Sequence, residues 1–356
     1  MVLESFLTQI DCRQTVRLRH GCIPMSSANK YIVTGELNMK KIGISFIPMT
    51  EKYLAKIKAA APGFEYYVTE DFHDEKLLDC EIVFGSMSPR LIAQSTKLKW
   101  IHLQWAGVDG ILGSRHKFPD HVILTNSSGS YGVTISEYLL TMTLMLMRNM
   151  RDYILQQEQK IWHRITKEQS IYASTVCVIG LGNIGENYAK RCKALGAKRV
   201  TGVVRTAKDV VPSCVDELYT VNEIENAVKD ADVVAICLPG TSETKNLVNE
   251  ALLLKMKKGV LILNIGRGII IDTQALIAQL NSGHIGGAAL DVTEPEPLPQ
   301  DSPLWSMPNV IITPHMSGHN SLDTTNDLGV EKFVDYLEDY VANKPLKRVV
   351  DKTLGY

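Results

Sequence analysis

The sequence has no apolar run long enough to cross a membrane. Its longest apolar stretch, residues 135–147, is interrupted by Glu137 and falls short of the roughly 20 residues that a bilayer requires. Charge of one sign is not in excess either, because the chain has 38 Lys and Arg and 39 Asp and Glu, and the basic residues do not form one tract. These features predict neither a membrane anchor nor a nucleic-acid partner.

Cysteine pairs at metal-binding or redox spacing are also lacking. The seven cysteines contain no C-x-x-C pair and are odd in number, which favours a reducing compartment and a cytoplasmic protein. Cys177 and Cys237 lie inside apolar runs, where a small buried thiol is the simplest interpretation. His315 and His319 could suggest zinc, but no third ligand has suitable spacing and Gly318 disfavours a helix that would align them. No metal site is predicted.

The first 38 residues differ from the rest of the chain. They lack the continuous apolar segment of a secretory signal, and the first clear strand, KIGISF, starts just after Met39. Arg13, Arg17 and Arg19 leave an organelle-targeting segment as an alternative. We interpret residues 1–38 as a loosely ordered leader or an extension from an earlier start codon, and we expect a chain that starts at Met39 to fold and work like the full-length chain.

Two series of short apolar runs follow, each alternating with helix-compatible segments. The first extends from Lys41 to about Leu124 and contains five runs, and the second starts at Thr175 and contains six. Such alternation predicts βα units around parallel sheets. Because 356 residues exceed the usual size of one domain, we expect an α/β protein with two doubly wound parallel-sheet domains.

One long helix is predicted between the two series, over residues 133–157. Apolar residues recur along it at the three- and four-residue spacing of a helix face: Leu139, Met142, Leu146 and Met150. Such a stripe is more often core or subunit interface than a ligand site.

The expected division of the chain follows from these elements. Residues 39–132 and 316–356 would form the substrate domain, because a last helix at about 331–341 could return to the first sheet. Residues 133–315 would form the dinucleotide-binding domain, including the linking helix, because six strands are the number expected of a dinucleotide-binding sheet.

A glycine-rich segment follows the first strand of the second series. Residues 180–185, GLGNIG, fit the pattern G-x-G-x-x-G, come directly after an apolar run and open a helix that Gly196 ends. Gly180 permits the tight turn, Gly182 lets the backbone approach a pyrophosphate, and Gly185 allows close packing of helix on sheet. Free N–H groups at the start of the helix attract an anion. The segment therefore predicts a dinucleotide site.

Four short elements stand in a fixed order further downstream. They are N-x-x-R-G at 264–268, L-D-V at 290–292, Glu296-Pro297 and Pro314-His315. Their order and spacing resemble the signature region of the D-isomer-specific 2-hydroxyacid dehydrogenases. The resemblance also includes LQWAGVDG at 103–110 and the glycine-rich segment, and so covers the chain from Met39 onward.

This resemblance implies the fold and the activity in more detail. A flavodoxin-like substrate domain would join a Rossmann-type dinucleotide-binding domain. The enzyme would transfer a hydride between NADP(H) or NAD(H) and a small 2-keto or D-2-hydroxy acid, as a glyoxylate/hydroxypyruvate-type reductase does. It would be a homodimer built around the helix near Leu139 to Met150.

The chemistry of the residues supports the same catalytic set. Reduction of a 2-keto acid needs a cation for the carboxylate, a proton donor for the developing alkoxide and a source of hydride. Arg267 follows the apolar run VLILNI, so its guanidinium would emerge where ligands bind in open α/β sheets, and it suits bidentate carboxylate binding. His315 follows NVIIT and could donate the proton, with Glu296 stabilising the charged imidazole.

Wider binding sets follow from the resemblance. The predicted cofactor-binding residues are Gly180, Gly182, Asn183, Ile184, Gly185, Arg205, Thr206, Leu238, Pro239, Thr244, Ile265, Gly266, Arg267, Asp291, His315 and Ser317. Among them, Asp291 would contact the nicotinamide amide. The predicted substrate-binding residues are Ser86, Met87, Ala106, Gly107 and Val108, with Arg267 and His315. Trp105 and Met49 could limit the size of the substrate side chain.

The strand RVTGVV ends without the acidic residue that usually binds the ribose 2′-hydroxyl in an NAD site. Val204 stands at that place, followed by Arg205 and Thr206, with Lys208 close in sequence. A carboxylate there would repel a 2′-phosphate, whereas a guanidinium would bind it. We predict that NADP(H) is preferred and NAD(H) possible. The alternative is that Arg205 only points into solvent beside a pocket that accepts either nucleotide.

Two other functions compete with a keto-acid reductase. A nucleotide-sensing scaffold, like the corepressor-like members of the same family, is not excluded by an intact catalytic set, but no added peptide-binding segment favours it. Formate dehydrogenation is the weaker alternative, because it has no carbonyl that needs a general acid and this sequence has the Glu–His pair. The sequence leaves the identity of the keto acid open.

Overall fold

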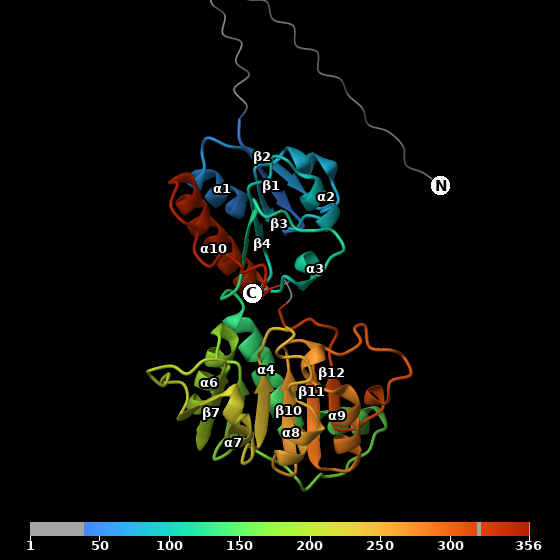
Figure 1. Ribbon diagram of the computed structural model, residues 1–356. Coiled ribbons are helices and arrows are strands. Elements are labelled where there is room, and N and C mark those ends of the chain that lie inside the picture. Colours follow the sequence, from blue (N-terminus) through green and yellow to red (C-terminus); the bar gives the residue numbers. More distant parts are fainter. Residues whose placement is uncertain (1–38, 319–321, 356) are drawn as a thin grey trace, which may run out of the picture. The chain divides into compact units, whose positions relative to one another are not determined.

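The computed structural model describes residues 39–318 and 322–355, so the predictions for residues 1–38 and for His319 lie outside the described part. Within that part, Met39 onward forms one compact unit that contains two parallel sheets (Figure 1). The prediction of an α/β protein with two parallel sheets is confirmed.

The first sheet has five strands, and each coincides with one predicted apolar run. They are β1 (Lys41–Ser45), β2 (Glu65–Thr69), β3 (Ile82–Gly85), β4 (Trp100–Leu103) and β5 (Ile123–Asn126). Their order in the sheet is β2-β1-β3-β4-β5, which is the flavodoxin-like order. Short helical segments connect them: α1 (Glu51–Ala60), η1 (Glu75–Asp79), α2 (Pro89–Gln94) and α3 (Asp109–Leu112).

The last helix, α10 (Asp323–Val341), packs beside α1 and covers one face of this first sheet. Phe333 of α10 stacks on Phe84 of β3 with ring centroids 4.1 Å apart. Two ion pairs join α10 to α1 at its surface, Lys52 to Asp327 and Lys56 to Glu331. The helix starts earlier than the expected residue 331. That residues 39–132 and 316–356 form a domain of their own stays a prediction.

The second sheet has seven strands rather than the predicted six. They are β6 (Thr175–Ile179), β7 (Arg199–Val204), β8 (Glu217–Thr220), β9 (Val233–Ile236), β10 (Val260–Asn264), β11 (Ile285–Leu290) and β12 (Val310–Ile312). The order β12-β11-β10-β9-β6-β7-β8 contains the Rossmann arrangement, with the direction of winding reversed between β6 and β9. The missed strand, β8, is a short edge strand whose four residues are all only partly buried.

Helices cover both faces of the seven-stranded sheet. They include α6 (Asn183–Ala194), α7 (Ile224–Val228), α8 (Glu250–Lys255) and α9 (Thr273–Asn281), with the 3₁₀ segments η2 (Val221–Glu223), η3 (Gly268–Ile270) and η4 (Pro303–Trp305). Separate apolar clusters fill the two sides, which explains why the strands read as continuous apolar runs. Cys177 is completely buried in β6, where burial raises its pKa to about 12, in agreement with a packing role.

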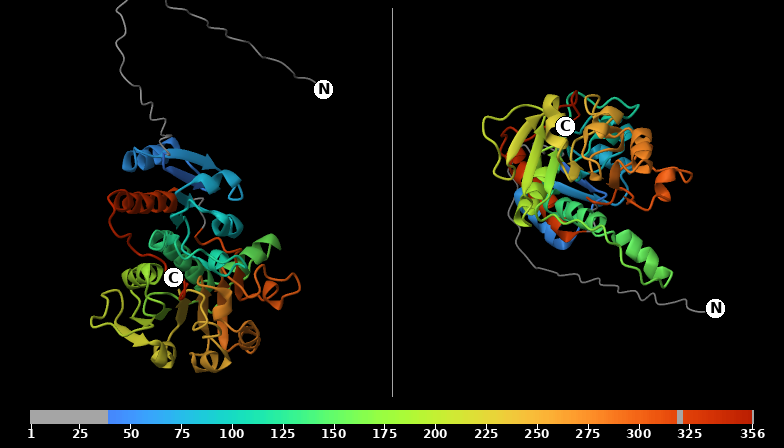
Figure 2. Two further views of the ribbon diagram at one scale, coloured as in Figure 1. Left: turned by 45° about the horizontal axis from the view of Figure 1, so that its top comes forward. Right: turned by 90° about the horizontal axis from the view of Figure 1, so that it is seen from below.

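The prediction of a single helix over residues 133–157 is wrong. The segment forms two helices, α4 (Gly132–Met147) and α5 (Met150–Glu158), which Figure 2 shows in green. Asn149 between them adopts a left-handed backbone with φ of 51°, a conformation that asparagine tolerates better than most residues and that ends a helix. Leu139 of α4 is buried against α6, so this part of the apolar stripe belongs to the core of its own chain.

None of the helices in the described residues combines the length and the apolar character needed to span a membrane. Over the same residues, no group of three or more His, Cys, Asp or Glu side chains is arranged to hold a metal ion.

Candidate active site

The predicted site residues of the second sheet follow the carboxyl ends of its strands. Because the strands are parallel, these ends meet at one edge of the sheet. The glycine-rich turn follows β6, Leu238 and Pro239 follow β9, and residues 265–267 follow β10. Asp291 follows β11 and residues 313–317 follow β12. The fold therefore brings segments that are far apart in the sequence to one place.

The glycine-rich turn has the geometry that each glycine predicts. Gly180 has a φ of 102°, and a Cβ there would lie 2.7 Å from the carbonyl oxygen of Cys237. A Cβ on Gly185 would lie 2.1 Å from the carbonyl oxygen of Gly180, so α6 can pack this closely only with glycine. At Gly182, by contrast, a Cβ would meet nothing within 4 Å. The turn thus exposes backbone at the N-terminus of a twelve-residue helix, where a pyrophosphate fits.

The loop after β7 lies beside this turn. Val204 is buried at the end of the strand, and Arg205 and Thr206 after it are exposed. Lys208 reaches back to Glu186, in the first turn of α6, with Nζ 3.8 Å from Oε1. The cationic loop is therefore next to the start of α6, where the ribose of a bound dinucleotide would be expected.

The loop after β9 contacts both of its neighbouring loops. Thr244 closes it by donating a hydrogen bond from Oγ1 to the carbonyl oxygen of Pro239 at 2.7 Å. Leu238 lies between the glycines of the two adjacent turns. A Cβ on Gly180 would lie 3.0 Å from Cδ2 of Leu238, and a Cβ on Gly266 would lie 2.4 Å from its carbonyl oxygen. These contacts place the predicted residues of this loop at the same edge.

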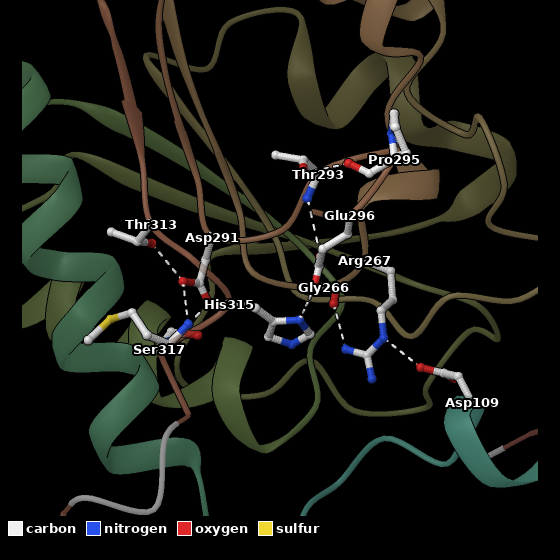
Figure 3. A network of polar contacts seen from close by, with 11 residues as sticks. Asp109, Gly266, Arg267, Asp291, Thr293, Pro295, Glu296, Thr313, His315 and Ser317 are labelled. Atoms are coloured by element: carbon white, nitrogen blue, oxygen red, sulfur yellow. Dashed lines mark hydrogen bonds and ion pairs between the residues drawn. The ribbon is translucent and has the colours of Figure 1, made fainter. Parts of the chain in front are cut away.

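His315 and Glu296 form a pair, with Nδ1 of the imidazole 2.7 Å from Oε1 of the carboxylate (Figure 3). Both side chains are partly exposed. Since Nδ1 faces Glu296, Nε2 is the ring nitrogen left to meet a ligand. The backbone of His315 is left-handed, with φ of 50°. A non-glycine residue in this conformation is uncommon and costs free energy, and such residues cluster at functional sites.

Buried Asp291 holds the loop that carries His315 in this conformation. Its backbone carbonyl accepts a hydrogen bond from the N–H of His315 at 2.8 Å. Its carboxylate accepts from the N–H of Met316 at 2.9 Å, from the N–H of Ser317 at 3.0 Å and from Oγ1 of Thr313 at 2.6 Å (Figure 3). Asp291 thus fixes the chain on both sides of His315, a role that the sequence does not reveal. Its expected contact with the nicotinamide stays a prediction.

The same network extends to helix α4. Oγ1 of Thr313 is 2.6 Å from the hydroxyl of Tyr138. Because Thr313 donates its proton to Asp291, Tyr138 is the donor in this contact. Burial raises the pKa of Tyr138 to about 12, so its hydroxyl stays a donor even at alkaline pH.

Arg267 forms an ion pair with Asp109, the first residue of α3. Nε of Arg267 is 2.7 Å from Oδ2 of Asp109, and Nη1 donates to the carbonyl oxygen of Gly266 at 2.8 Å (Figure 3). A Cβ on Gly107 would lie 2.1 Å from Nη2 of Arg267, so a larger residue there would push the guanidinium away from this loop of the first sheet. The pair therefore joins loops of the two sheets, and it was not expected from the sequence.

These residues surround a hollow of about 460 Å³. Loops of the first sheet contribute Phe46, Trp105, Ala106, Gly107, Asp109 and Gly110. The second sheet contributes Ile184, Ile265, Arg267, His315, Ser317 and Gly318, and Tyr131 and Ile135 come from the start of α4. A guanidinium, an imidazole and apolar walls thus meet in one open hollow, which is the usual make-up of a site for a small ligand.

The hollow separates the predicted substrate residues into two groups. Of the residues that the structure describes, the lining includes Ala106 and Gly107 but not Ser86, Met87 or Val108. Met87 and Val108 are buried in an apolar cluster against which Trp105 packs, and the N–H of Ser86 donates a hydrogen bond to the carbonyl oxygen of Ser45. If these three contribute to binding, their loop backbones would have to do so.

Several residues of the hollow were missed in the sequence. Phe46, Tyr131 and Ile135 carry no motif, and Asp109 is 158 positions from its partner Arg267. One signal was available for Phe46, which directly follows β1 and therefore had to lie at the carboxyl edge of the first sheet.

Comparison with known proteins agrees with this arrangement. Residues 140–317 match the model of the NAD-binding domain of D-isomer-specific 2-hydroxyacid dehydrogenases. A putative 2-hydroxyacid dehydrogenase of Haemophilus influenzae is 30% identical over 308 residues, which are 80% of this chain and 94% of the relative.

Two crystal structures resemble the chain over most of its length. One is a D-isomer-specific 2-hydroxyacid dehydrogenase family protein of Aeromonas salmonicida, with a TM-score of 0.77, 32% identity and coverage of 88% of this chain and 99% of that one. The other is the NADPH-dependent glyoxylate/hydroxypyruvate reductase of Sinorhizobium meliloti in complex with NADP and sulfate. It has a TM-score of 0.75, 28% identity and coverage of 89% and 100%.

Proposed function

Because the chain belongs to the D-isomer-specific 2-hydroxyacid dehydrogenase family and is thus an NAD(P)-dependent oxidoreductase, we propose that Arg267, Glu296 and His315 form its catalytic set. We further propose that it acts as a glyoxylate/hydroxypyruvate-type reductase, since the NADPH-dependent relative of S. meliloti carries that name. The observation that carries the proposal is the meeting of the His315–Glu296 pair with Arg267 around one hollow.

Each residue has a separate task in this mechanism. The guanidinium of Arg267 binds the substrate carboxylate, while Nε2 of His315 donates a proton to the carbonyl oxygen as it gains charge. Glu296 holds Nδ1 of the imidazole and stabilises its charged form. The nicotinamide, when bound, supplies the hydride to the carbonyl carbon. In the reverse direction, His315 takes the proton back from the hydroxyl.

The residues present fit such a cofactor. The open space at Gly182 and the start of α6 suit a pyrophosphate. Ile184, Ile265 and Ser317 line the same hollow as Arg267 and His315, and they would hold the nicotinamide, which would supply the hydride there.

The direct test is a panel of 2-keto acids assayed with NADPH and with NADH. Turnover of glyoxylate or hydroxypyruvate supports a reductase of this type. Absence of turnover with glyoxylate, hydroxypyruvate, pyruvate and branched 2-keto acids, with either cofactor, would overturn it and leave a nucleotide-sensing scaffold as the better proposal.

We propose a preference for NADP(H), supported by the exposed Arg205 and Thr206 after β7 and by the absence of an acidic residue at Val204. Arg205→Ala is expected to weaken the binding of NADPH but not of NADH, by about 1.5–3 kcal/mol, which is the contribution of a hydrogen bond to a charged group. The measurement is kcat/KM for both reduced cofactors in the wild type and the variant. A higher kcat/KM with NADH in the wild type, or an equal loss of kcat/KM with both cofactors in the variant, would contradict the assignment.

We also propose a homodimer, but one formed by α5 rather than by the buried stripe of α4. Exposed apolar side chains gather on α5 and the segment after it: Met150, Ile154, Leu155, Ile161 and Trp162, the last with its whole surface accessible. Ile161 and Trp162 also line a hollow of about 610 Å³, together with Tyr153 and polar residues between 156 and 164. A two-fold axis would bury this surface twice, which makes a second copy of the chain a suitable occupant.

Ile154→Asp is expected to shift the protein from dimer to monomer, because an unpaired carboxylate would be buried in the interface. The affinity of the two subunits for each other should fall by more than about 100-fold. Leu254→Asp is the matched control, since Leu254 is likewise an exposed apolar residue on a helix, α8. Sedimentation velocity over a range of concentrations measures both. A wild type that is monomeric at high concentration would refute the proposed interface.

A further inference from the structure

We propose that the hollow selects 2-keto acids with a flat apolar side chain, above all aryl-substituted ones, because Phe46 and Trp105 form the wall that faces this substituent. The inference rests on the proposed reduction of 2-keto acids and refines its substrate: glyoxylate and hydroxypyruvate would be reduced at this site, but less efficiently than an aryl-substituted keto acid. It makes Phe46 a specificity-determining residue, although no motif singles it out.

The geometry of a 2-keto acid leads to this assignment. Its carbonyl carbon has three substituents, and the site assigns two of them: the oxygen to His315 and the carboxylate to Arg267 beside Gly107. Ile184 and Ile265 would hold the nicotinamide, which would supply the hydride from their side of the hollow. The third substituent then points toward the rest of the lining, to which the first sheet contributes Phe46 and Trp105 and the start of α4 contributes Tyr131 and Ile135. Tyr131 and Ile135 are buried, whereas Phe46 is exposed, so we assign the substituent to the wall formed by Phe46 and Trp105.

This remaining wall is aromatic. The rings of Phe46 and Trp105 are 6.3 Å apart at 83°, and those of Phe46 and Phe72 are 5.4 Å apart at 73°. Both contacts are edge-to-face, the arrangement that aromatic rings prefer. Phe46 nevertheless keeps 48% of its surface exposed, so one side of its ring remains free for a further apolar group.

The backbone of Phe46 adopts an unfavourable conformation to hold the ring at this place. Its φ of 58° is left-handed, which is a genuine outlier for a bulky residue. Its N–H donates to the carbonyl oxygen of Thr69 at 3.1 Å, which anchors the turn after β1. The strained conformation directs the ring into the hollow rather than into the core of the first sheet.

The charges of the hollow disfavour acidic substrate side chains. Among the described lining residues, Arg267 is the one with a permanent positive charge, and the substrate carboxylate already needs it. Asp109, 2.7 Å from Arg267, adds a negative charge beside it. A second carboxylate on the substrate would therefore meet repulsion and no further cation. Glyoxylate and hydroxypyruvate avoid this repulsion but leave the aromatic wall without contact.

The experiment compares phenylpyruvate with glyoxylate through the ratio of their kcat/KM values. We expect this ratio to exceed about 10 in the wild type and to fall by about 10- to 100-fold in Phe46→Ala, the range over which an apolar pocket discriminates. Phe46→Leu, which keeps apolar bulk without the ring, should give an intermediate ratio. Tyr172→Ala is the control, because Tyr172 is an exposed aromatic residue outside the hollow, and its ratio should equal that of the wild type.

The outcomes separate this inference from the proposed function. If glyoxylate is reduced but phenylpyruvate is a poorer substrate, or if Phe46→Ala leaves the ratio unchanged, the aromatic wall does not set specificity and the proposed function still stands. If neither acid is reduced with NADPH or NADH, the proposed function itself is overturned. A ratio that falls equally in Tyr172→Ala would also overturn the inference, because the effect would not be specific to the wall.

Discussion

His315→Ala is expected to lower kcat for keto-acid reduction by about 10²- to 10⁴-fold, because a positioned general acid contributes on that scale. The affinity for NADPH should change much less, since the glycine-rich turn that we propose to bind the phosphates follows a different strand, β6. Stopped-flow or steady-state rates at saturating NADPH measure the first effect, and a fluorescence titration of NADPH measures the second.

Two further variants show whether the imidazole itself is responsible. His315→Asn removes the imidazole but tolerates the left-handed backbone, so it should be as slow as alanine while preserving the loop. His121→Ala removes an exposed histidine outside the hollow and should keep the wild-type rate. Wild-type turnover in His315→Asn would remove His315 from the mechanism.

Arg267→Lys is expected to lower kcat/KM by at least about 10²-fold although the charge is kept. The ammonium group cannot reproduce a planar fork that bonds the substrate carboxylate while Nε remains on Asp109, and each lost hydrogen bond to a charged group costs about 1.5–3 kcal/mol. Kinetics with at least two keto acids should show the same loss, because every substrate has the carboxylate.

Arg90→Lys is the matched control for this change. Arg90 also forms an ion pair with a carboxylate, that of Glu75, but at the exposed surface and outside the hollow. Its replacement should leave kcat/KM at the wild-type value. Should Arg267→Lys retain both substrate affinity and turnover, the substrate carboxylate is held by another group.

The sheets were predictable from sequence because nine of their twelve strands are buried along most of their length and appear as continuous apolar runs. β2 and β12 are less buried, but their runs EYYV and NVIIT are still mostly aromatic or β-branched. β8, with the sequence ELYT and only partly buried residues, was missed. The break between α4 and α5 escaped for a different reason: the left-handed residue there is Asn149 rather than glycine, and the apolar spacing continues across it.

The candidate site also has a part that the sequence predicts and a part that it does not. Arg267, Asp291 and His315 could be placed at one edge because each directly follows a parallel strand of the same sheet. What no motif predicts is how side chains from separate segments meet, such as Arg267 with Asp109 or Thr313 with Tyr138. Those contacts depend on how loops of the first sheet and helix α4 pack against this edge, which is a property of the tertiary structure.

The position of α10 has a consequence for how the protein folds during its synthesis. Phe333 covers Phe84 and Trp100 on the first sheet, yet residues 61–322, including the entire second sheet, are synthesised between α1 and α10. At about 5–20 residues per second, this takes on the order of tens of seconds. During that time the second sheet can form while the aromatic face of the first is still uncovered. A ribosome that stalls before α10 would release a chain with a finished dinucleotide fold and an apolar face that chaperones and proteases recognise.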